Sequence, residues 1–168
     1  MTIEEALASA LAFERKVQAH YEKAREGVPE GEAREFFGLM AAEEARHVEY
    51  LEHKREQWLS TGAIGPTEVE SAVPRRDWLQ EGKRRLAEAK GHPDRSYGLG
   101  HLEESLRLEE EVSAHYRQLV DGVDDPEAKA LFRRFLEIED GHTALVRAEL
   151  DYVTGTGHFL GIREFTLD

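Results

Sequence analysis

Two short stretches of the sequence place a carboxylate and an imidazole one helical turn apart. They are Glu44-x-x-His47 and Glu139-x-x-His142, in which x stands for any residue. Because side chains three residues apart in a helix project from the same face, each stretch would present an oxygen and a nitrogen ligand to one point. Such ligands without sulfur suit iron or manganese, and zinc can occupy the site by affinity alone. The two stretches together predict a metal centre.

Both stretches lie in an internal repeat. With an offset of 95 residues and no gap, 12 of the 34 positions in 14–47 are identical to their counterparts in 109–142. Average composition would give about two or three identities by chance. We therefore expect two copies of one helical hairpin that pack about a pseudo-twofold axis.

The repeat indicates which acidic residues to consider as ligands. Glu43 and Glu44 could each share a face with His47, at spacings of four and three residues. The counterpart of Glu43 is Ile138, whereas the counterpart of Glu44 is Glu139. The repeat therefore favours Glu44.

An earlier acidic residue in each hairpin passes the same comparison. Glu14 corresponds to Glu109, whereas the neighbouring Glu110 and Glu111 correspond to basic residues in the first copy. The helical angles of Glu110 and Glu111 point away from the face of Glu109. Whether either of them contacts a metal stays open at this point.

The four repeated glutamates fall within apolar stripes when the segments are drawn as helices. A buried carboxylate is costly, so these groups must either take up protons or be compensated by cations. No Lys or Arg lies on the inward stripes, whereas two divalent cations would balance four carboxylates beside two neutral imidazoles. The alternative is a purely structural bundle that buries protonated acids and histidines. The predicted metal ligands are Glu14, Glu44, His47, Glu109, Glu139 and His142.

The segments that carry these residues have the pattern of four long helices. Apolar residues recur at spacings of three and four, while Gly and Pro lie at the joints. Short turns join the helices within each hairpin, whereas about 40 residues separate the two hairpins. This order of connections is typical of a ferritin-like four-helix bundle, so we predict an all-α fold. The expected helices are about 3–26, 30–60, 102–119 and 125–153.

A single domain of residues 1–168 accommodates these elements. The long crossover must span the length of the bundle, and a short helix from about Arg75 to Lys90 fits inside it. The last residues alternate glycine with apolar side chains and are expected to form a packing or dimer arm. The expected parts are hairpin one (3–60), the crossover (62–100), hairpin two (100–153) and the C-terminal arm (154–168).

Composition narrows the possible functions. The 168 residues carry 35 acidic and 22 basic side chains, and this net charge of -13 argues against binding to nucleic acid or an anionic membrane. The absence of cysteine excludes disulfides, thiolate metal sites and a cysteine nucleophile. There is no apolar run long enough for a membrane span and no basic leader, so we expect a cytoplasmic protein.

The motifs resemble those of the rubrerythrin branch of the ferritin-like superfamily, and the likeness covers both hairpins. The resemblance implies that Glu44 and Glu139 bridge two metals, and that each histidine of the motifs binds one metal. It implies that Glu14 and Glu109 are terminal ligands.

Two tyrosines extend the likeness. Tyr21 and Tyr116 each follow a predicted terminal ligand by seven residues. They resemble the tyrosines that hydrogen-bond to ligand carboxylates in that family. The candidate catalytic residues are therefore Glu44, Glu139, Tyr21 and Tyr116.

The resemblance also implies a reaction, the reduction of hydrogen peroxide or dioxygen at two iron ions. Manganese or a mixed iron and manganese centre would use the same ligands. Because the chain has no cysteine for the rubredoxin domain of that family, electrons would come from an external donor. Val112 takes the place of a further glutamate ligand of that family. The family and the apolar arm favour a homodimer. Two other functions stay open, a ferroxidase that handles iron and a structural metal-binding bundle without turnover.

The other histidines are not predicted as ligands. His20 and His115 are repeat counterparts, but they lie about 120° from the face of Glu14 and Glu109, and we expect them to pack near the ligands or at an interface. The remaining histidines have no repeat counterpart and are expected on the surface or in the tail. They are His53, His92, His101 and His158.

Overall fold

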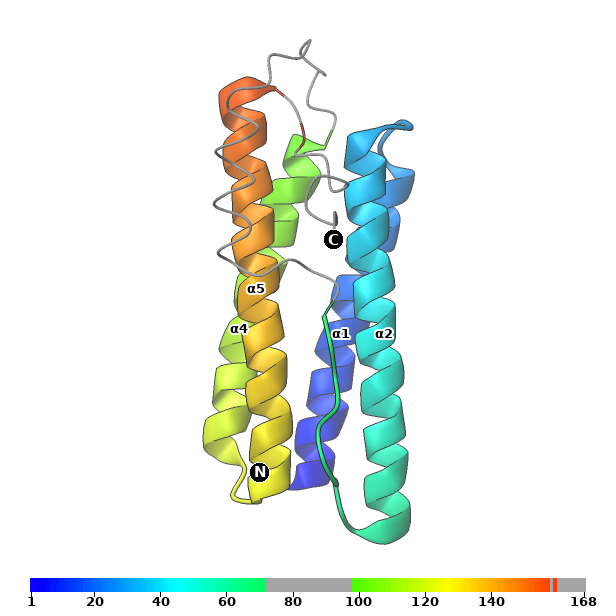
Figure 1. Cartoon of the computed structure of the whole chain (residues 1–168), viewed down its shortest axis with the longest axis vertical. Helices are drawn as coiled ribbons and strands as arrows, with labels where there is room; N and C mark the ends of the chain where they lie inside the picture. The colour runs from blue at the N-terminus through cyan, green and yellow to red at the C-terminus, as the bar shows by residue number, and fades with distance from the viewer. Residues whose placement is uncertain (72–97, 158, 160–168) are drawn as a thin grey trace.

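Four long helices make up most of the chain that the structure describes. The structure is a computed structural model, and it describes residues 1–71, 98–157 and 159. These residues contain no strand, and their helices form an all-α four-helix bundle, as the apolar spacing predicts (Figure 1). The helices are α1 (Ile3–Glu26), α2 (Glu32–Thr61), α4 (Leu99–Gly122) and α5 (Pro126–Thr156).

The helix ends follow local capping rules. The Thr2 side chain accepts a hydrogen bond from the Glu5 amide, and the Glu5 carboxylate accepts one from the Thr2 amide, which satisfies two amides at the start of α1. Asp125 caps α5 by accepting a hydrogen bond from the Ala128 amide. Gly157, with φ of 76°, ends α5 in the left-handed conformation that glycine adopts without strain. Because this stop comes late, α5 continues past the predicted end of the fourth helix.

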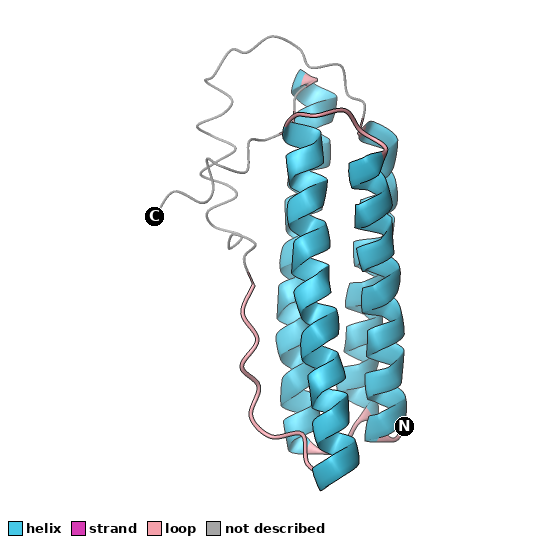
Figure 2. Ribbon diagram, turned by 90° about the vertical axis from the view of Figure 1, so that its right-hand side faces the viewer, coloured by secondary structure: helices cyan, strands magenta, loops and turns pink. Residues whose placement is uncertain are grey.

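The helices pack as two antiparallel hairpins. α1 packs against α2 and α4 packs against α5, and the hairpins meet mainly where α1 runs beside α4 (Figures 1 and 2). None of the described helices is both long and apolar enough to cross a membrane. Six aromatic side chains are the largest fully buried ones among the described residues. They are Tyr21, Tyr116, Phe36, Phe37, Phe132 and Phe135.

Contacts within the two hairpins follow the offset of the repeat. Arg15 Nη2 lies 2.5 Å from Glu52 Oε1 between α1 and α2, and Arg147 Nη2 lies 2.5 Å from Glu110 Oε1 between α5 and α4. Position 110 corresponds to position 15 and position 147 to position 52, so the second hairpin keeps the contact with its charges exchanged. The two copies therefore share this contact, in agreement with the predicted pseudo-twofold relation.

Residues 63–71, which we call the strap, follow α2 and run along the seam between α2 and α5 (Figure 1). Lys54 of α2 is buried, and its Nζ donates to the carbonyl oxygens of Ile64 and Pro66 at 3.0 and 2.7 Å. Arg134 of α5 donates through Nε to the Val69 carbonyl at 3.0 Å. The strap therefore joins the two hairpins along a seam where α2 and α5 make few direct contacts.

Two predicted parts of the chain are described only in part. The strap is the first section of the predicted crossover, whereas the predicted helix from Arg75 to Lys90 lies outside the described residues. Most of the predicted C-terminal arm also lies outside them. Its Phe159 is described, and the ring packs 6.1 and 6.0 Å from the rings of Phe36 and Phe37.

Candidate metal centre

The six predicted ligands are buried inside the bundle, with exposed fractions of 0 or 1%. Four of them, Glu44, His47, Glu139 and His142, offer ligand atoms that all lie within 4.8 Å of one another. The two Glu-x-x-His stretches therefore face each other, and this cluster could hold metal. The ligands come from α1 (Glu14), α2 (Glu44 and His47), α4 (Glu109) and α5 (Glu139 and His142).

One half of the cluster surrounds His47. Its Nδ1 lies 3.2 Å from Glu44 Oε2, 3.3 Å from Glu14 Oε2 and 3.4 Å from Glu139 Oε1. Three carboxylates from three different helices thus meet one ring nitrogen.

The other half surrounds His142 in the same manner. Its Nδ1 lies 2.9 Å from Glu44 Oε1, 3.3 Å from Glu139 Oε2 and 3.8 Å from Glu109 Oε2. The two imidazole rings are parallel to within 6°, and their centroids are 5.3 Å apart. Glu44 and Glu139 therefore present one oxygen to each histidine, whereas Glu14 and Glu109 each face a single one.

The buried tyrosines connect the hairpins at the same level. Tyr21 OH donates to Glu109 Oε1, and Tyr116 OH donates to Glu14 Oε1. The predicted contact between tyrosine and carboxylate is therefore present, and in both cases the carboxylate belongs to the other hairpin. Each bond occupies one oxygen and leaves Oε2 directed at a histidine.

Several polar atoms of the cluster are buried without a hydrogen-bond partner among the described residues. They include both oxygens of Glu139, Oε2 of Glu14 and of Glu109, and both ring nitrogens of His142. An unpaired buried polar atom costs about 1–3 kcal/mol, so native structures pair such atoms with protein, water or an ion. These oxygen and nitrogen donors converge from several helices. They therefore fit divalent cations.

Burial changes the acidity of the glutamates that face one histidine. Burial, and then repulsion by Glu139 and Glu44, raises the pKa of Glu14 well above that of an ordinary glutamate. Burial also raises the pKa of Glu109 well above that value, although the neighbouring His142 opposes the change. Without cations, both groups therefore retain protons well above the pH at which a glutamate normally loses them.

The pKa values of the two glutamates that lie between the histidines shift in the opposite direction. Burial disfavours their ionisation, but His142 and His47 hold the pKa of Glu44 well below its usual value, and the same histidines lower the pKa of Glu139. Burial likewise disfavours imidazolium, yet the two carboxylates raise the pKa of both histidines well above the usual value. Without cations, two carboxylates therefore pair with two imidazolium groups beside two protonated acids.

Glu43 joins the cluster although the repeat comparison misses it. Its side chain is buried, and its Oε1 lies 3.7 Å from His47 Nε2 and 3.6 Å from His142 Nε2. The comparison excludes Glu43 because its counterpart is Ile138, but a single carboxylate placed between two histidines needs no counterpart. The signal in the sequence is the spacing of four residues between Glu43 and His47.

The neighbouring acids of α4 point away from the cluster. Glu110 pairs with Arg147, and Glu111 Oε2 lies 3.1 Å from Lys16 Nζ. All four side chains are partly exposed. Glu110 and Glu111 therefore lie away from the face of Glu109, as their helical angles predict.

The repeated histidines lie between α1 and α4. His20 Nε2 is 2.7 Å from Ser105 Oγ, and His115 Nε2 is 2.5 Å from Ser9 Oγ. Both rings are half-buried. They pack at the interface between the hairpins, in agreement with the prediction.

The histidines without counterparts differ from one another. His53 is exposed, as expected. His101 is half-buried rather than on the surface, because its ring packs edge-on against Phe37 at 5.9 Å. His92 and His158 lie outside the described residues.

Comparisons with family models, with curated proteins and with solved structures found no match for this chain. The interpretation of the cluster therefore depends on its geometry and its chemistry.

Proposed function

We propose that the cluster holds two metal ions, one beside each histidine, and that the chain is a rubrerythrin-like di-iron oxidoreductase. The observation that carries the proposal is the reciprocal placement of Glu44 and Glu139, each of which presents one oxygen to each histidine. Carboxylates so placed would bridge two ions, while Glu14 and Glu109 would each serve one ion. This arrangement corresponds to the two-metal sites of ferritin-like carboxylate proteins.

The charge of the four proposed glutamate ligands supports the binding of two divalent ions. Four ionised glutamates carry four negative charges, which two divalent ions would balance, and neutral imidazoles would then be available to hold the ions through Nδ1. The ligand set contains oxygen and nitrogen donors without sulfur, which suits iron or manganese.

Two ferrous ions bound here would supply the two electrons that, with two protons, convert one hydrogen peroxide into two water molecules. The chain itself holds the ligands and excludes bulk water. Tyr21 and Tyr116 each fix one oxygen of a terminal glutamate. Because all six ligands are buried, the reactant must be small. The sequence has no cysteine for an electron-transfer site, so the proposal includes an external electron donor.

Metal content is the first test of this proposal. The protein is loaded with ferrous iron without air, desalted and analysed for iron per chain. About two irons per chain are expected, and stoichiometric peroxide should then oxidise them faster than air does. Iron near zero in a folded protein contradicts the metal centre. Two irons that are indifferent to peroxide contradict the reaction, and a load far above two favours iron handling instead.

Removal of both bridging carboxylates tests the ligand assignment. Glu44→Ala combined with Glu139→Ala should abolish paired metal binding, because both histidine positions lose two oxygen ligands at once. Glu110→Ala, on the outer face of α4, is the control and should bind metal as the unmodified chain does. Retention of two metals by the double variant contradicts the bridging roles.

A further inference from the structure

Glu43 lies on the side of both histidines that faces away from the proposed metals. The Nδ1 atoms of His47 and His142 point at the ligand carboxylates, whereas the Nε2 atoms of the same rings point at Glu43 Oε1. These contacts of 3.7 and 3.6 Å are within ion-pair range and slightly longer than a hydrogen bond. A small rotation of either ring would bring Nε2 within hydrogen-bonding distance of this oxygen.

A histidine that binds a metal through one ring nitrogen needs a hydrogen-bond acceptor for the N–H of the other. When Nδ1 binds a metal, the proton of the neutral ring resides on Nε2, and the acceptor of that proton sets both the tautomer and the ring orientation. Nε2 of His47 and of His142 has no hydrogen-bond partner among the described residues. Glu43 Oε1 is the carboxylate oxygen that both of them face.

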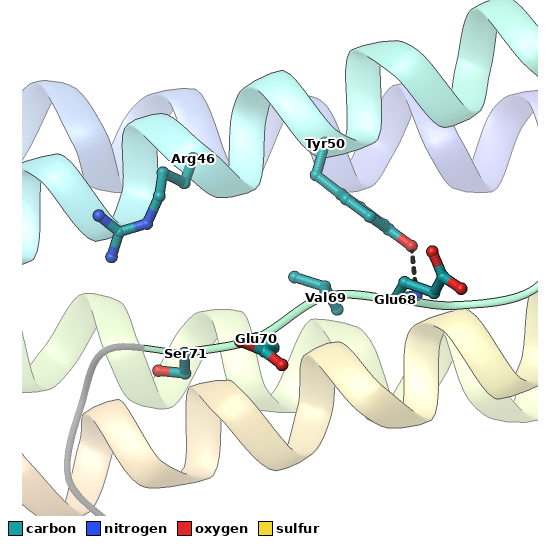
Figure 3. Close-up of a pocket in the computed structure, with 6 residues that line it drawn as sticks. All are labelled: Arg46, Tyr50, Glu68, Val69, Glu70 and Ser71. Carbon is teal, nitrogen blue, oxygen red and sulfur yellow. Dashed lines mark hydrogen bonds between the residues drawn. The ribbon is translucent and has the colours of Figure 1, made fainter.

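Glu43 is itself held in place by two residues nearer the surface, one in the strap and one in α2. The Ser71 hydroxyl, at the end of the strap, donates to Glu43 Oε1, and Arg46 Nη2 donates to Glu43 Oε2. Arg46 and Ser71 line a surface pocket together with Tyr50 and strap residues (Figure 3). A continuous set of contacts thus leads from the strap through one carboxylate to both histidines.

We propose that Glu43 is a positioning residue that keeps both ligand histidines in the tautomer presenting Nδ1 to the metals, and that Ser71 couples it to the strap. The inference rests on the metal centre of the proposed function, but it does not depend on the reaction. It also explains why the repeat breaks at this position. One carboxylate serves two histidines, so the second hairpin needs no second one, and the counterpart position holds the buried apolar side chain of Ile138.

Zinc is the probe for the test because it takes the same ligands and undergoes no redox change. Zinc affinity is measured by competition with a chelator, and the histidine tautomers are read from long-range proton–nitrogen NMR spectra of the full chain. In the unmodified protein we expect two zinc ions, with both rings protonated at Nε2. Glu43→Ile introduces the residue of the repeat counterpart and should weaken zinc binding about 10- to 100-fold.

Two further variants separate positioning from a general loss of structure. Glu43→Gln keeps the shape of the side chain and should give a smaller loss of zinc affinity, with mixed histidine tautomers. This variant tests the positioning role if Glu43→Ile does not fold. Glu49→Gln, an exposed glutamate of the same helix, should change neither readout. Unmodified protein without zinc binding overturns the proposed function. Two zinc ions bound with unchanged affinity and tautomers in the Glu43 variants overturn the positioning role alone.

Discussion

Each buried tyrosine hydroxyl satisfies one oxygen of a glutamate in the other hairpin. In Tyr21→Phe the Oε1 atom of Glu109 loses its donor while it stays buried, so the free energy of unfolding should fall by about 1–3 kcal/mol. Tyr116→Phe should have a similar effect through Glu14, because the two contacts are related by the repeat. Chemical denaturation of the metal-free protein measures both changes.

The same variants also bear on metal binding. Tyr21→Phe should weaken zinc binding without changing the number of ions, because Glu109 keeps Oε2 directed at His142 but loses its fixed orientation. Ser60→Ala is the control, since its exposed hydroxyl donates only to a carbonyl of the same helix, that of Gln57. Equal stability and affinity in all variants would contradict a structural role for these hydroxyls.

Proton release provides a prediction from the pKa shifts. The pKa values of Glu14, Glu109 and both histidines are raised in the cation-free protein, so these groups hold protons that bound metal must displace. Zinc affinity should therefore rise with pH, with release of up to about four protons per two ions. Calorimetric titration in buffers of different ionisation enthalpy measures the release. Affinity that does not change between about pH 6 and 8 contradicts this picture.

At the scale of the elements, Lys54 fixes the strap to α2. Its buried ammonium donates to two strap carbonyls, and Lys54→Met would leave both carbonyls without this donor. A loss of about 1–3 kcal/mol in the free energy of unfolding is expected. Hydrogen exchange at the Glu68 amide, which donates to Tyr50 OH, should also become faster.

A surface lysine provides the matched control for this variant. Lys16 is about half-exposed and pairs with Glu111 at 3.1 Å, and such surface pairs contribute little. Lys16→Met should therefore leave strap exchange unchanged. Equal exchange in the Lys54 and Lys16 variants would show that the strap does not depend on the buried ammonium.

The helices could be predicted from the sequence, whereas the path of the strap could not. Each helix carries an apolar stripe, and the cap at Asp125 is a local signal. The strap is held by bonds from Lys54 and Arg134 to main-chain carbonyls, and a carbonyl is the same group at every residue. A pattern of side chains therefore cannot indicate where it docks.

At the scale of the whole molecule, the internal repeat made most of the cluster predictable. Because symmetry places counterparts such as Glu44 and Glu139 around one axis, residues that are distant in sequence could be assigned to one site. Symmetry also explains what was missed. Glu43 contributes from one hairpin alone, so a comparison between copies removes it. Its spacing of four residues from His47 is the one signal in the sequence, and its distances to His47 and His142 place it in the cluster.

The bundle as a whole should become more stable when metal binds. The proposed ligands come from all four described helices, so the complete site exists only in the folded chain. Metal at a hundred times its Kd should therefore add about 2.7 kcal/mol per site. For a chain of this size, two sites correspond to a rise in Tm of roughly 10–20 °C. Thermal unfolding with zinc, and again after chelation, measures the difference. The Glu44→Ala and Glu139→Ala double variant should show little difference in Tm between the two conditions. A Tm that chelation does not change would mean that the buried acids are compensated by their own protons and imidazolium partners, without metal.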